Sequence, residues 1–334
     1  MTESIEAKEL DNGGAEAIKG FNFQKANLML IAINNYEKNN FKIYIEAEDD
    51  IVVSYEDYKA FIQVKKQKHT LSSITKQESK KINGPDGKKI TKLLPSILEK
   101  NLRSGTEDDT YKIFVKDIGN SDKKLLNIKK PGLICSEIYE LGDQAKAKII
   151  PELPAELINK IGDFYFFISP INEDLLEAEK YLIGCLNEID VSVDNKRGRA
   201  VIAELSLTID QKAQEVLSEK VDKEIKSMDI NYFSKVFVTC KTLNEFDNIL
   251  NSLGYNAVAT KQIRNERLKI ELNLTKLKTD MKKALEELIE HDENLIDLSN
   301  KEIIGQLVRN FESSDYSRNT LISVAIECLC EVET

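Results

Sequence analysis

The first hundred residues alternate between apolar and polar positions in ways that predict a helix followed by a hairpin. Residues 15–36 are expected to be helical because their apolar side chains recur at helical spacing: Phe21, Leu28, Ile31 and Ala32. Two runs rich in Ile, Val, Tyr and Phe follow, residues 42–55 and 59–66, joined by the polar residues 56–58. Such runs are typical of strands, so together they predict a β-hairpin.

The middle of the chain predicts alternating strands and helices. The strand candidates are Tyr111–Val115, Phe164–Ser169, Ala200–Ile209 and Val236–Cys240, and residues 173–187 predict a helix. Residues 76–109 predict an exposed loop around the Gly-rich turn 83–87, with a helix over 88–101 that Pro95 would interrupt. The alternation favours an α/β domain.

The last third of the chain changes to a helical pattern. Residues 261–290 carry an apolar side chain every three or four positions, which predicts one long amphipathic helix. Ser299 and Glu302 fit a capping box, and a final helix is indicated by Leu321, Val324, Ala325, Cys328 and Leu329. We therefore expect an α/β domain over residues 1–240 and a helical docking or oligomerisation region over 241–334.

The predicted hairpin sorts its polar residues onto one face. A turn centred between residues 57 and 58 pairs Val52 with Gln63 and Asp50 with Lys65. Side-chain alternation then places Asp50, Gln63 and Lys65 on one face, with Glu48 just beyond and Asp49 facing away. A slip of one residue would move Asp50 to the opposite face.

This polar set matches the needs of phosphodiester hydrolysis. A carboxylate and a carbonyl oxygen can hold Mg²⁺ while leaving several of its waters in place. A neighbouring lysine can orient the attacking water or stabilise the charge that builds on phosphorus. The same residues also fit an ordinary hairpin with cross-strand Asp–Lys pairs.

Composition excludes several other kinds of active site. The chain has only two histidines, His69 and His291, so histidine nucleases, zinc hydrolases and Ser-His-Asp enzymes are not indicated. Neither the phosphate-binding loop Gly-x-x-x-x-Gly-Lys-Ser/Thr nor Gly-x-Gly-x-x-Gly occurs.

The five cysteines are scattered, apart from Cys328-x-Cys330, and are expected to be reduced core thiols. No apolar run is long enough to span a bilayer and the N-terminus does not resemble a signal peptide, which predicts a cytoplasmic protein.

Charge is distributed unevenly along the chain. The net charge is −10, yet residues 59–130 contain 18 Lys and Arg against 8 Asp and Glu. A basic segment directly after an acidic cluster favours binding to the DNA backbone, although a solvated lysine-rich surface is the alternative. The candidate DNA-binding residues are Lys66, Lys68, Lys80, Lys81, Lys88 and Lys89.

Three short stretches resemble a known nuclease family. They are Gly20-Phe-Asn-Phe-Gln24, Glu46-Ala-Glu-Asp-Asp50-Ile and Ile62-Gln-Val-Lys65. Together they resemble the N-terminal effector nuclease of the CD-NTase-associated (CBASS) double-stranded DNA endonucleases, whose relatives occur in other antiphage systems, including Lamassu. The resemblance covers residues 10–75 and becomes vaguer up to residue 240. It implies the PD-(D/E)xK restriction-endonuclease-like fold, a mixed sheet flanked by helices.

The resemblance also implies roles for individual residues. Asp50, Gln63 and Lys65 take the catalytic positions, with Gln24 supporting them from the early helix. Asp50, Gln63 and Glu48 are the expected ligands of Mg²⁺, with Mn²⁺ as the alternative cofactor. Gln63 stands where the superfamily more often has Asp or Glu, and the lost charge should weaken resting metal affinity, so that DNA or assembly completes the site.

The expected function is a metal-dependent DNA endonuclease that acts as a defence effector. The C-terminal region is too short and too helical to resemble the cyclic-oligonucleotide sensor of the CBASS enzymes. We therefore expect regulation by a partner complex, an SMC-like ATPase with an accessory subunit, and consider a homo-oligomer. One alternative is a catalytically silent subunit that binds DNA or a partner, and another is a nuclease that cuts RNA.

Overall fold

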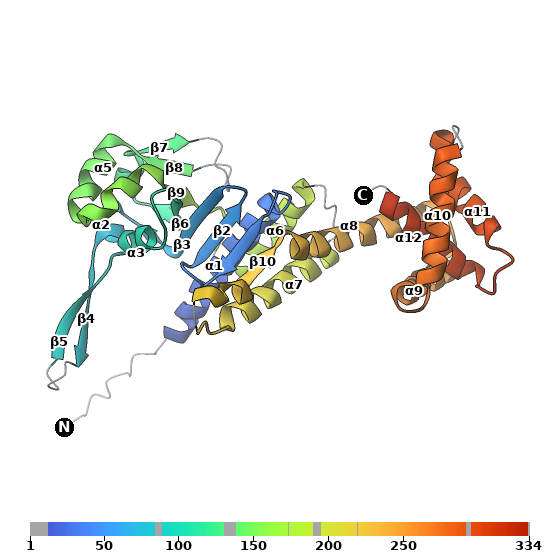
Figure 1. Ribbon diagram of the computed structural model, residues 1–334, viewed down its shortest axis with the longest axis horizontal. Coiled ribbons are helices and arrows are strands. Elements are labelled where there is room, and N and C mark those ends of the chain that lie inside the picture. The colour runs from blue at the N-terminus through green and yellow to red at the C-terminus, as the bar shows by residue number, and fades with distance from the viewer. Residues whose placement is uncertain are drawn as a thin grey trace, which may run out of the picture. The chain divides into compact units, whose positions relative to one another are not determined.

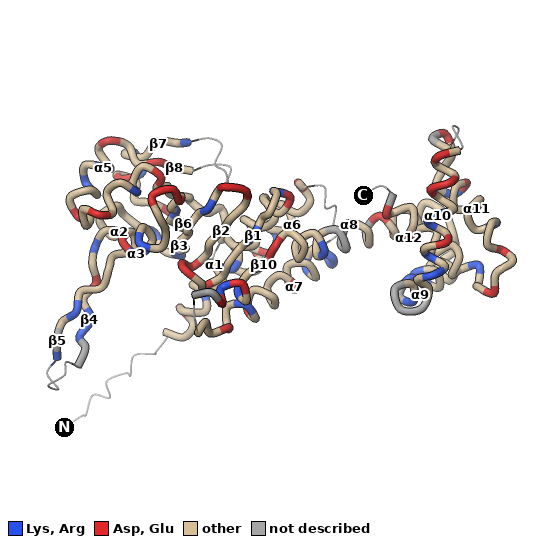
Figure 2. Tube along the Cα trace, in the orientation of Figure 1, with Lys and Arg blue, Asp and Glu red and all other residues tan. Residues whose placement is uncertain are grey.

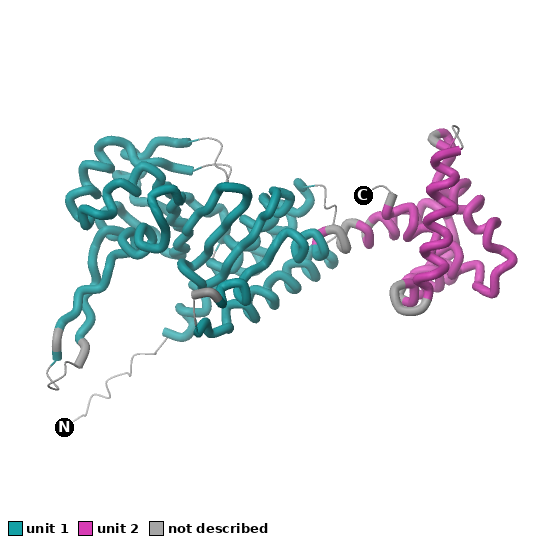
Figure 3. Tube along the Cα trace, in the orientation of Figure 1, with its two compact units in different colours: residues 1–190, 195–236 teal, residues 191–194, 237–334 magenta. Residues whose placement is uncertain are grey.

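A computed structural model describes most of the chain (Figure 1). The described residues are 13–83, 89–129, 138–172, 174–189, 195–218, 220–291 and 295–332. Lys88, Cys135 and the side chain of Cys240, about which the sequence makes predictions, lie outside them. The chain divides into two compact units, and the boundary falls between Val236 and Phe237 (Figure 3). Unit 1 holds the described residues up to 236, and unit 2 those from 237 onward.

Unit 1 is built on a mixed sheet of eight strands in the order β10-β1-β2-β3-β6-β9-β8-β7. In chain order these strands are β1 (Lys42–Ile45), β2 (Ile51–Tyr55), β3 (Tyr58–His69), β6 (Thr110–Ile118), β7 (Leu126–Lys129), β8 (Ile138–Leu141), β9 (Phe164–Ile168) and β10 (Ser227–Asp229). Strands β3, β6 and β9 are parallel, and every other neighbouring pair is antiparallel. The predicted α/β fold class, a mixed sheet flanked by helices, is confirmed.

Helices cover both faces of β3, the strand at the centre of the sheet. The helical elements of unit 1 are α1 (Gly13–Asn35), α2 (Leu71–Thr75), α3 (Ile97–Arg103), α4 (Asn120–Lys123), α5 (Asp143–Ile149), η1 (Ile150–Glu152), η2 (Ala155–Asp163), α6 (Leu175–Glu188), α7 (Asn195–Gln214) and η3 (Lys220–Lys226). Phe61 is fully buried in a core with Leu98 and Leu102 of α3. Ile62 points to the opposite face and is also fully buried, and α1 packs on β3. Both faces of β3 are therefore fixed by packing.

Unit 2 is helical, as the sequence predicts. It contains most of α8 (Ile230–Ser252) together with α9 (Ala257–Asn273), α10 (Thr275–His291), η4 (Leu295–Asp297), α11 (Asn300–Asn310) and α12 (Arg318–Val332). The predicted capping box of Ser299 and Glu302 begins α11. Helix α12 is central to the core, where Val324, Ala325 and Cys328 are fully buried. No helix among the described residues is both long and apolar enough to cross a membrane.

Two predicted strands are helical in the structure. Residues 200–209 lie in α7 and residues 236–240 lie in α8. The buried side chains of α7, Val201, Leu205 and Ile209, are spaced four residues apart, which is the period of a helix. The prediction was wrong because it weighted the β-branched and apolar composition above this spacing.

Three further predicted boundaries differ from the structure. Residues 42–55 form two strands, β1 and β2, separated by a turn. The expected helix over 88–101 is instead the strand β5 (Lys89–Leu94) followed by α3, because Pro95 separates the two. The expected helix over 261–290 is broken at Leu274, where the backbone leaves the helical conformation, and both α9 and α10 pack on α12.

Burial should make the cysteines of α12 unreactive in the folded protein. Cys185, Cys328 and Cys330 are free and buried, in agreement with the predicted core thiols. Burial raises the pKa of Cys328 to about 12, so almost no thiolate exists at pH 8. We expect alkylation of Cys328 by iodoacetamide at pH 8 to be at least about 100-fold slower in the native protein than in urea. Site-resolved mass spectrometry measures both rates, and equal rates would contradict the buried position.

Candidate active site

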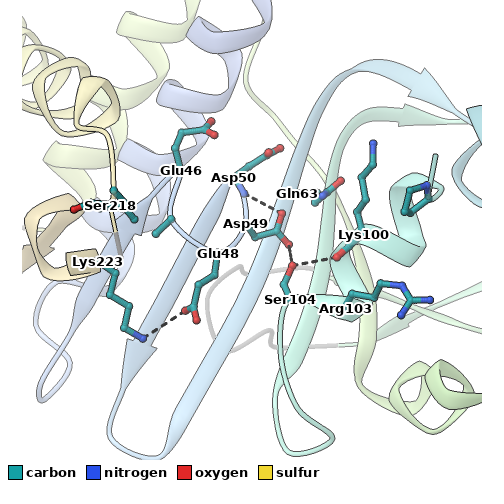
Figure 4. A pocket seen from close by; sticks show the side chains of 13 residues that line it. Glu46, Glu48, Asp49, Asp50, Gln63, Lys100, Arg103, Ser104, Ser218 and Lys223 are labelled. Carbon is teal, nitrogen blue, oxygen red and sulfur yellow. Dashed lines mark hydrogen bonds and ion pairs between the residues drawn. The ribbon is translucent and has the colours of Figure 1, made fainter. Parts of the chain in front are cut away.

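An open pocket in unit 1 lies beside the turn between β1 and β2 (Figure 4). We call residues 46–50 the acidic loop, since Glu46, Glu48, Asp49 and Asp50 all belong to it and all line this pocket. The pocket has a volume of about 770 Å³. Its remaining lining comes from Ala47 of the same loop, from Gln63 of β3, from Pro95, from α3 with Ser104 directly after it, and from Leu217, Ser218 and Lys223.

Asp50 is fixed at the edge of this pocket by β3. One of its carboxylate oxygens, Oδ2, accepts hydrogen bonds from the backbone N–H of Val64 at 2.9 Å and from Lys65 Nζ at 3.1 Å. The predicted contact between Asp50 and Lys65 is therefore present. The second oxygen, Oδ1, makes neither of these bonds and remains available to another ligand.

The predicted strand register is wrong by two residues. Val52 pairs with Phe61 and Ile51 with Ile62, because the turn consists of two residues, Glu56 and Asp57, flanked by the pair Tyr55 and Tyr58. A shift of two residues keeps each side chain on its predicted face. Asp50 lies outside β2 and reaches Lys65 from the acidic loop.

Gln63 lines the same pocket as the acidic loop and has an unsatisfied side-chain oxygen. The residue is 7% exposed, and Oε1 is buried with no hydrogen-bond partner among the described residues. A buried carbonyl oxygen without a partner is costly, so a native structure that keeps one calls for a ligand or another functional reason. Gln63 is the second predicted catalytic residue, and the structure brings it to the same pocket as Asp50.

The prediction that Asp49 faces away is wrong. Its carboxylate lines the pocket and accepts hydrogen bonds from Asn101 Nδ2 at 2.7 Å, from Ser104 Oγ at 3.3 Å and from the backbone N–H of Asp50 at 2.9 Å. Strand alternation does not apply here because residues 46–50 form a loop. Burial raises the pKa of Asp49 to about 6, although the bonds from Asn101 and the Asp50 N–H oppose that rise.

The opposite end of the acidic loop is held by α1 and by a buried lysine. Gln24, the predicted supporting residue, donates from Nε2 to Glu46 Oε1 at 2.6 Å and to the Asp50 carbonyl at 3.2 Å. Lys226 is buried and donates to the Glu46 carbonyl at 3.0 Å. Glu46 itself adopts a left-handed backbone, with φ of 48°, and burial raises the pKa of its carboxyl group. These contacts fix the loop on both sides.

Glu48, the third predicted metal ligand, is engaged by two lysines. Its Oε2 lies 3.5 Å from Lys59 Nζ and 3.6 Å from Lys223 Nζ. It lines the same pocket as Asp50, and Figure 4 shows its carboxylate directed toward Lys223. Release from these lysines would be needed before it could bind a cation.

The sequence did not single out five other polar residues of the pocket. They are Lys100, Arg103 and Ser104 from or directly after α3, Ser218, and Lys223 from η3. Arg103 is paired with Glu99 and Glu156, whereas Lys100 forms no ion pair among the described residues. These residues are far from the acidic loop in sequence, so local spacing could not reveal them.

The predicted DNA-binding lysines fall into two groups. Lys66 is paired with Glu16, and Lys68 is paired with Asp117 at 2.9 Å. Lys80, Lys81 and Lys89 are exposed on the hairpin formed by β4 (Glu78–Asn83) and β5 (Figure 2). Their role in DNA binding stays a prediction.

Comparison with a known protein identifies the family. Over 329 residues the chain is 36% identical to the Lamassu protein LmuA of Bacillus sp. (strain NCIM 5461 / CCTCC AB 2011126 / NIO-1130), covering 97% of this chain and 99% of that protein. The chain belongs to the Lamassu LmuA family. Residues 12–156 also match the family of the Cap4 dsDNA endonuclease domain, which confirms the resemblance seen in the sequence. No solved structure matches this LmuA-family chain.

The donor set of this LmuA-family pocket fits a hard divalent cation with few protein ligands. Among the described residues, no three His, Cys, Asp or Glu side chains are grouped so as to hold a metal. The available donors are the Asp50 carboxylate and the unpartnered Gln63 oxygen, with Glu48 lining the same pocket. Mg²⁺ accepts such a set, because it binds through one or two carboxylates, keeps several waters and completes its shell with substrate phosphates.

The raised pKa of Asp49 predicts a specific pH dependence of stability. Because its pKa is about 3.9 in an unfolded chain and about 6 in the fold, this group favours the folded state most below pH 4, and the benefit is lost as pH rises through 6. In EDTA, the loss of this benefit should lower the free energy of unfolding of the wild type by about 1 to 3 kcal/mol between pH 4 and pH 7. Asp49→Asn should lack this part of the decrease.

Urea unfolding at the two pH values measures this difference. Asp57→Asn is the matched control, since Asp57 is an exposed acid in the β2–β3 turn. It should follow the wild-type pH dependence. If Asp49→Asn did the same, Asp49 would not be the buried, proton-binding carboxyl described above.

Proposed function

We propose that this LmuA-family protein is a metal-dependent DNA endonuclease with Asp50, Gln63 and Lys65 at its catalytic centre. The observation that carries the proposal is a single arrangement: Asp50 is hydrogen-bonded to Lys65 and Val64, and the same pocket is lined by Gln63, whose buried side-chain oxygen has no partner among the described residues. A carboxylate, a carbonyl oxygen and a lysine are the groups that phosphodiester hydrolysis needs. The match to a double-stranded DNA endonuclease domain over residues 12–156 supports the choice of substrate.

Asp50 and Gln63 would hold the cation, and Glu48 would join them once released by Lys59 and Lys223. A bound Mg²⁺, or Mn²⁺ in its place, would supply Lewis-acid polarisation of the scissile phosphate and activation of a water. Gln63 contributes a neutral donor, so the resting site carries less negative charge than one with Asp or Glu there. Substrate phosphates then become an important part of the cation's shell.

Lys65 acts on the reacting phosphate and orients Asp50. Its ammonium group has three donors, of which one is given to Asp50 Oδ2. The side chain is 30% exposed, so the remaining donors can reach a substrate oxygen. Donors held in place before the reaction stabilise the charge that builds on the phosphate without having to reorganise.

Regulation by partners is the second part of the proposal. The family relationship to a Lamassu protein supports a role in antiphage defence. We propose that the protein acts within a complex that contains an SMC-like ATPase and an accessory subunit. The absence of both nucleotide-binding sequence patterns agrees with ATP hydrolysis by a separate subunit. Unit 2 would serve as the docking or oligomerisation region, and unit 1 as the nuclease.

Substitution of Asp50 or Lys65 should remove cleavage without unfolding the protein. We expect Asp50→Asn and Lys65→Gln each to lower plasmid cleavage in Mg²⁺ by at least about 100-fold, because each removes a group from the reacting centre. Asp57→Asn, in the exposed β2–β3 turn, should cleave at the wild-type rate. Gel analysis of plasmid nicking and linearisation measures the rates, and the proposed partner proteins are added if the isolated wild type is inactive.

Wild-type activity in Asp50→Asn would contradict the site assignment. A second readout does not depend on activation. Calorimetric titration with Mg²⁺ or Mn²⁺ should give heat of binding for the wild type and none for Asp50→Asn. Equal binding by both proteins would place the cation elsewhere.

Restoring a negative charge at position 63 should strengthen metal binding. We expect Gln63→Glu to tighten Mg²⁺ binding by at least about tenfold, or about 1.4 kcal/mol, because a second carboxylate is added beside Asp50. Gln67→Glu makes the same change at an exposed position of β3 and should leave the affinity unchanged. If the two variants titrated alike, Gln63 would not be a metal ligand.

A further inference from the structure

Strands β4 and β5 form a basic hairpin apart from the main sheet. We call it the arm, consisting of the described residues 78–83 and 89–94; it makes its own two-stranded sheet and projects from the body of unit 1 (Figure 1). Four lysines of the arm are exposed: Lys80, Lys81, Lys89 and Lys92. Figure 2 shows the positive charge along both strands.

The strand register distributes these charges over both faces of the arm. Lys80 and Lys92 are directly opposed, so they share one face. Lys81 and Lys89 lie on the other face, because side chains alternate along each strand. Each face therefore presents two positive charges.

This charge pattern does not stabilise the hairpin. Directly opposed like charges destabilise a strand pair, and an isolated two-stranded hairpin is at best marginally stable in water. Glu78 is the one acid among the described arm residues, and it is paired with Leu94 across the sheet. The opposed Lys80 and Lys92 therefore point to a function in which a polyanion neutralises them.

The arm lysines also differ from the lysines of the neighbouring strand β3. There, Lys65, Lys66 and Lys68 are each paired with an acid. Among the described residues, the four arm lysines form no ion pair and no side-chain hydrogen bond. Their ammonium groups are available to an external ligand without the loss of an existing contact.

The arm leads directly into the pocket wall. Strand β5 ends at Leu94, the next residue, Pro95, lines the pocket, and α3 then contributes Lys100 to it. Lys100, like the arm lysines, forms no ion pair among the described residues. Among the described residues, lysines without an ion pair are thus found on the arm and, beyond it along the chain, at Lys100 in the pocket lining.

We propose that the arm grips duplex DNA and leads its backbone to the pocket. Each arm strand has six residues, or about 20 Å of extended chain, and a two-stranded ribbon fits the major groove of B-form DNA. Lysines on both faces would contact the phosphates of the two backbones that flank the groove, and Lys100 would hold a phosphate near the reacting one. The inference rests on the proposed nuclease function, since it assigns the substrate path to the same pocket.

The test compares two quadruple variants of the full chain. One replaces Lys80, Lys81, Lys89 and Lys92 by Gln. The matched control replaces Lys124, Lys180, Lys196 and Lys235, four exposed lysines of unit 1 outside the arm, so that the net charge changes equally. Fluorescence anisotropy with a 30-base-pair duplex, in EDTA and over a series of salt concentrations, gives the affinity and its salt dependence for each protein.

The arm variant should lose most of the salt dependence of binding. Because each phosphate contact contributes about 0.9 to the slope of log K against log salt, four lost contacts should reduce the slope by about 3 to 4. The control should change it by less than about 1. Lys80→Glu is an additional variant, since it places an acid opposite Lys92, which favours the hairpin, and should nevertheless weaken DNA binding.

Three outcomes would overturn the inference. They are a wild-type slope in the arm variant, equal losses in the arm variant and the control, and undiminished DNA binding by Lys80→Glu. A change in the sedimentation mass of the arm variant at an unchanged slope would assign the arm to contacts between protein subunits instead. Because binding is measured without a divalent metal, the two proposals are tested separately. A negative result for the arm would not contradict the Asp50 cleavage experiment, and a negative result for the catalytic centre would not contradict DNA binding by the arm.

Discussion

The contact of Asp50 with Val64 and Lys65 is the interaction on which the site depends. It attaches the acidic loop to β3, and β3 is in turn held by β2 on one side, by β6 on the other and by buried side chains on both faces. A carboxylate bound by both a backbone N–H and a lysine has little freedom to rotate. The position of Asp50 is therefore set by a strand that is buried on both faces, which suits the preorganised catalytic role that we propose for it.

Four acids in five residues repel one another, and the surrounding elements offset this repulsion. Gln24 of α1 and the buried Lys226 hold Glu46 and the loop backbone, while Asn101 and Ser104 hold Asp49. Lys59 and Lys223 neutralise Glu48. The acidic loop is thus held in place before any cation binds, and the basic groups around the pocket favour an anionic substrate. We propose that chemistry and DNA binding are divided, with the arm supplying affinity and the acidic loop supplying catalysis.

The sequence predicted the fold class, and it singled out residues that the structure brings to one pocket. It predicted the geometry of that pocket less well. The side of the strand on which Gln63 and Lys65 lie was predicted correctly because alternation survives a register error of two residues. Asp49 was misplaced because alternation was extended into a loop. Residues of α3 and η3 could not be predicted as part of the pocket, since only tertiary packing brings them there. The prediction of a strand over residues 200–209 was wrong although the sequence contained the helical spacing. The β-branched and apolar composition was given more weight than that spacing.

The most direct test of the central claim is to locate the cation. Crystals of the full chain soaked in Mn²⁺ should show an anomalous scattering peak between the Asp50 carboxylate and Gln63 Oε1, at a ligand distance of about 2.0 to 2.3 Å. The same soak of Asp50→Asn crystals should show no peak there. A wild-type peak that does not touch Gln63, or an undiminished peak in Asp50→Asn, would contradict the account.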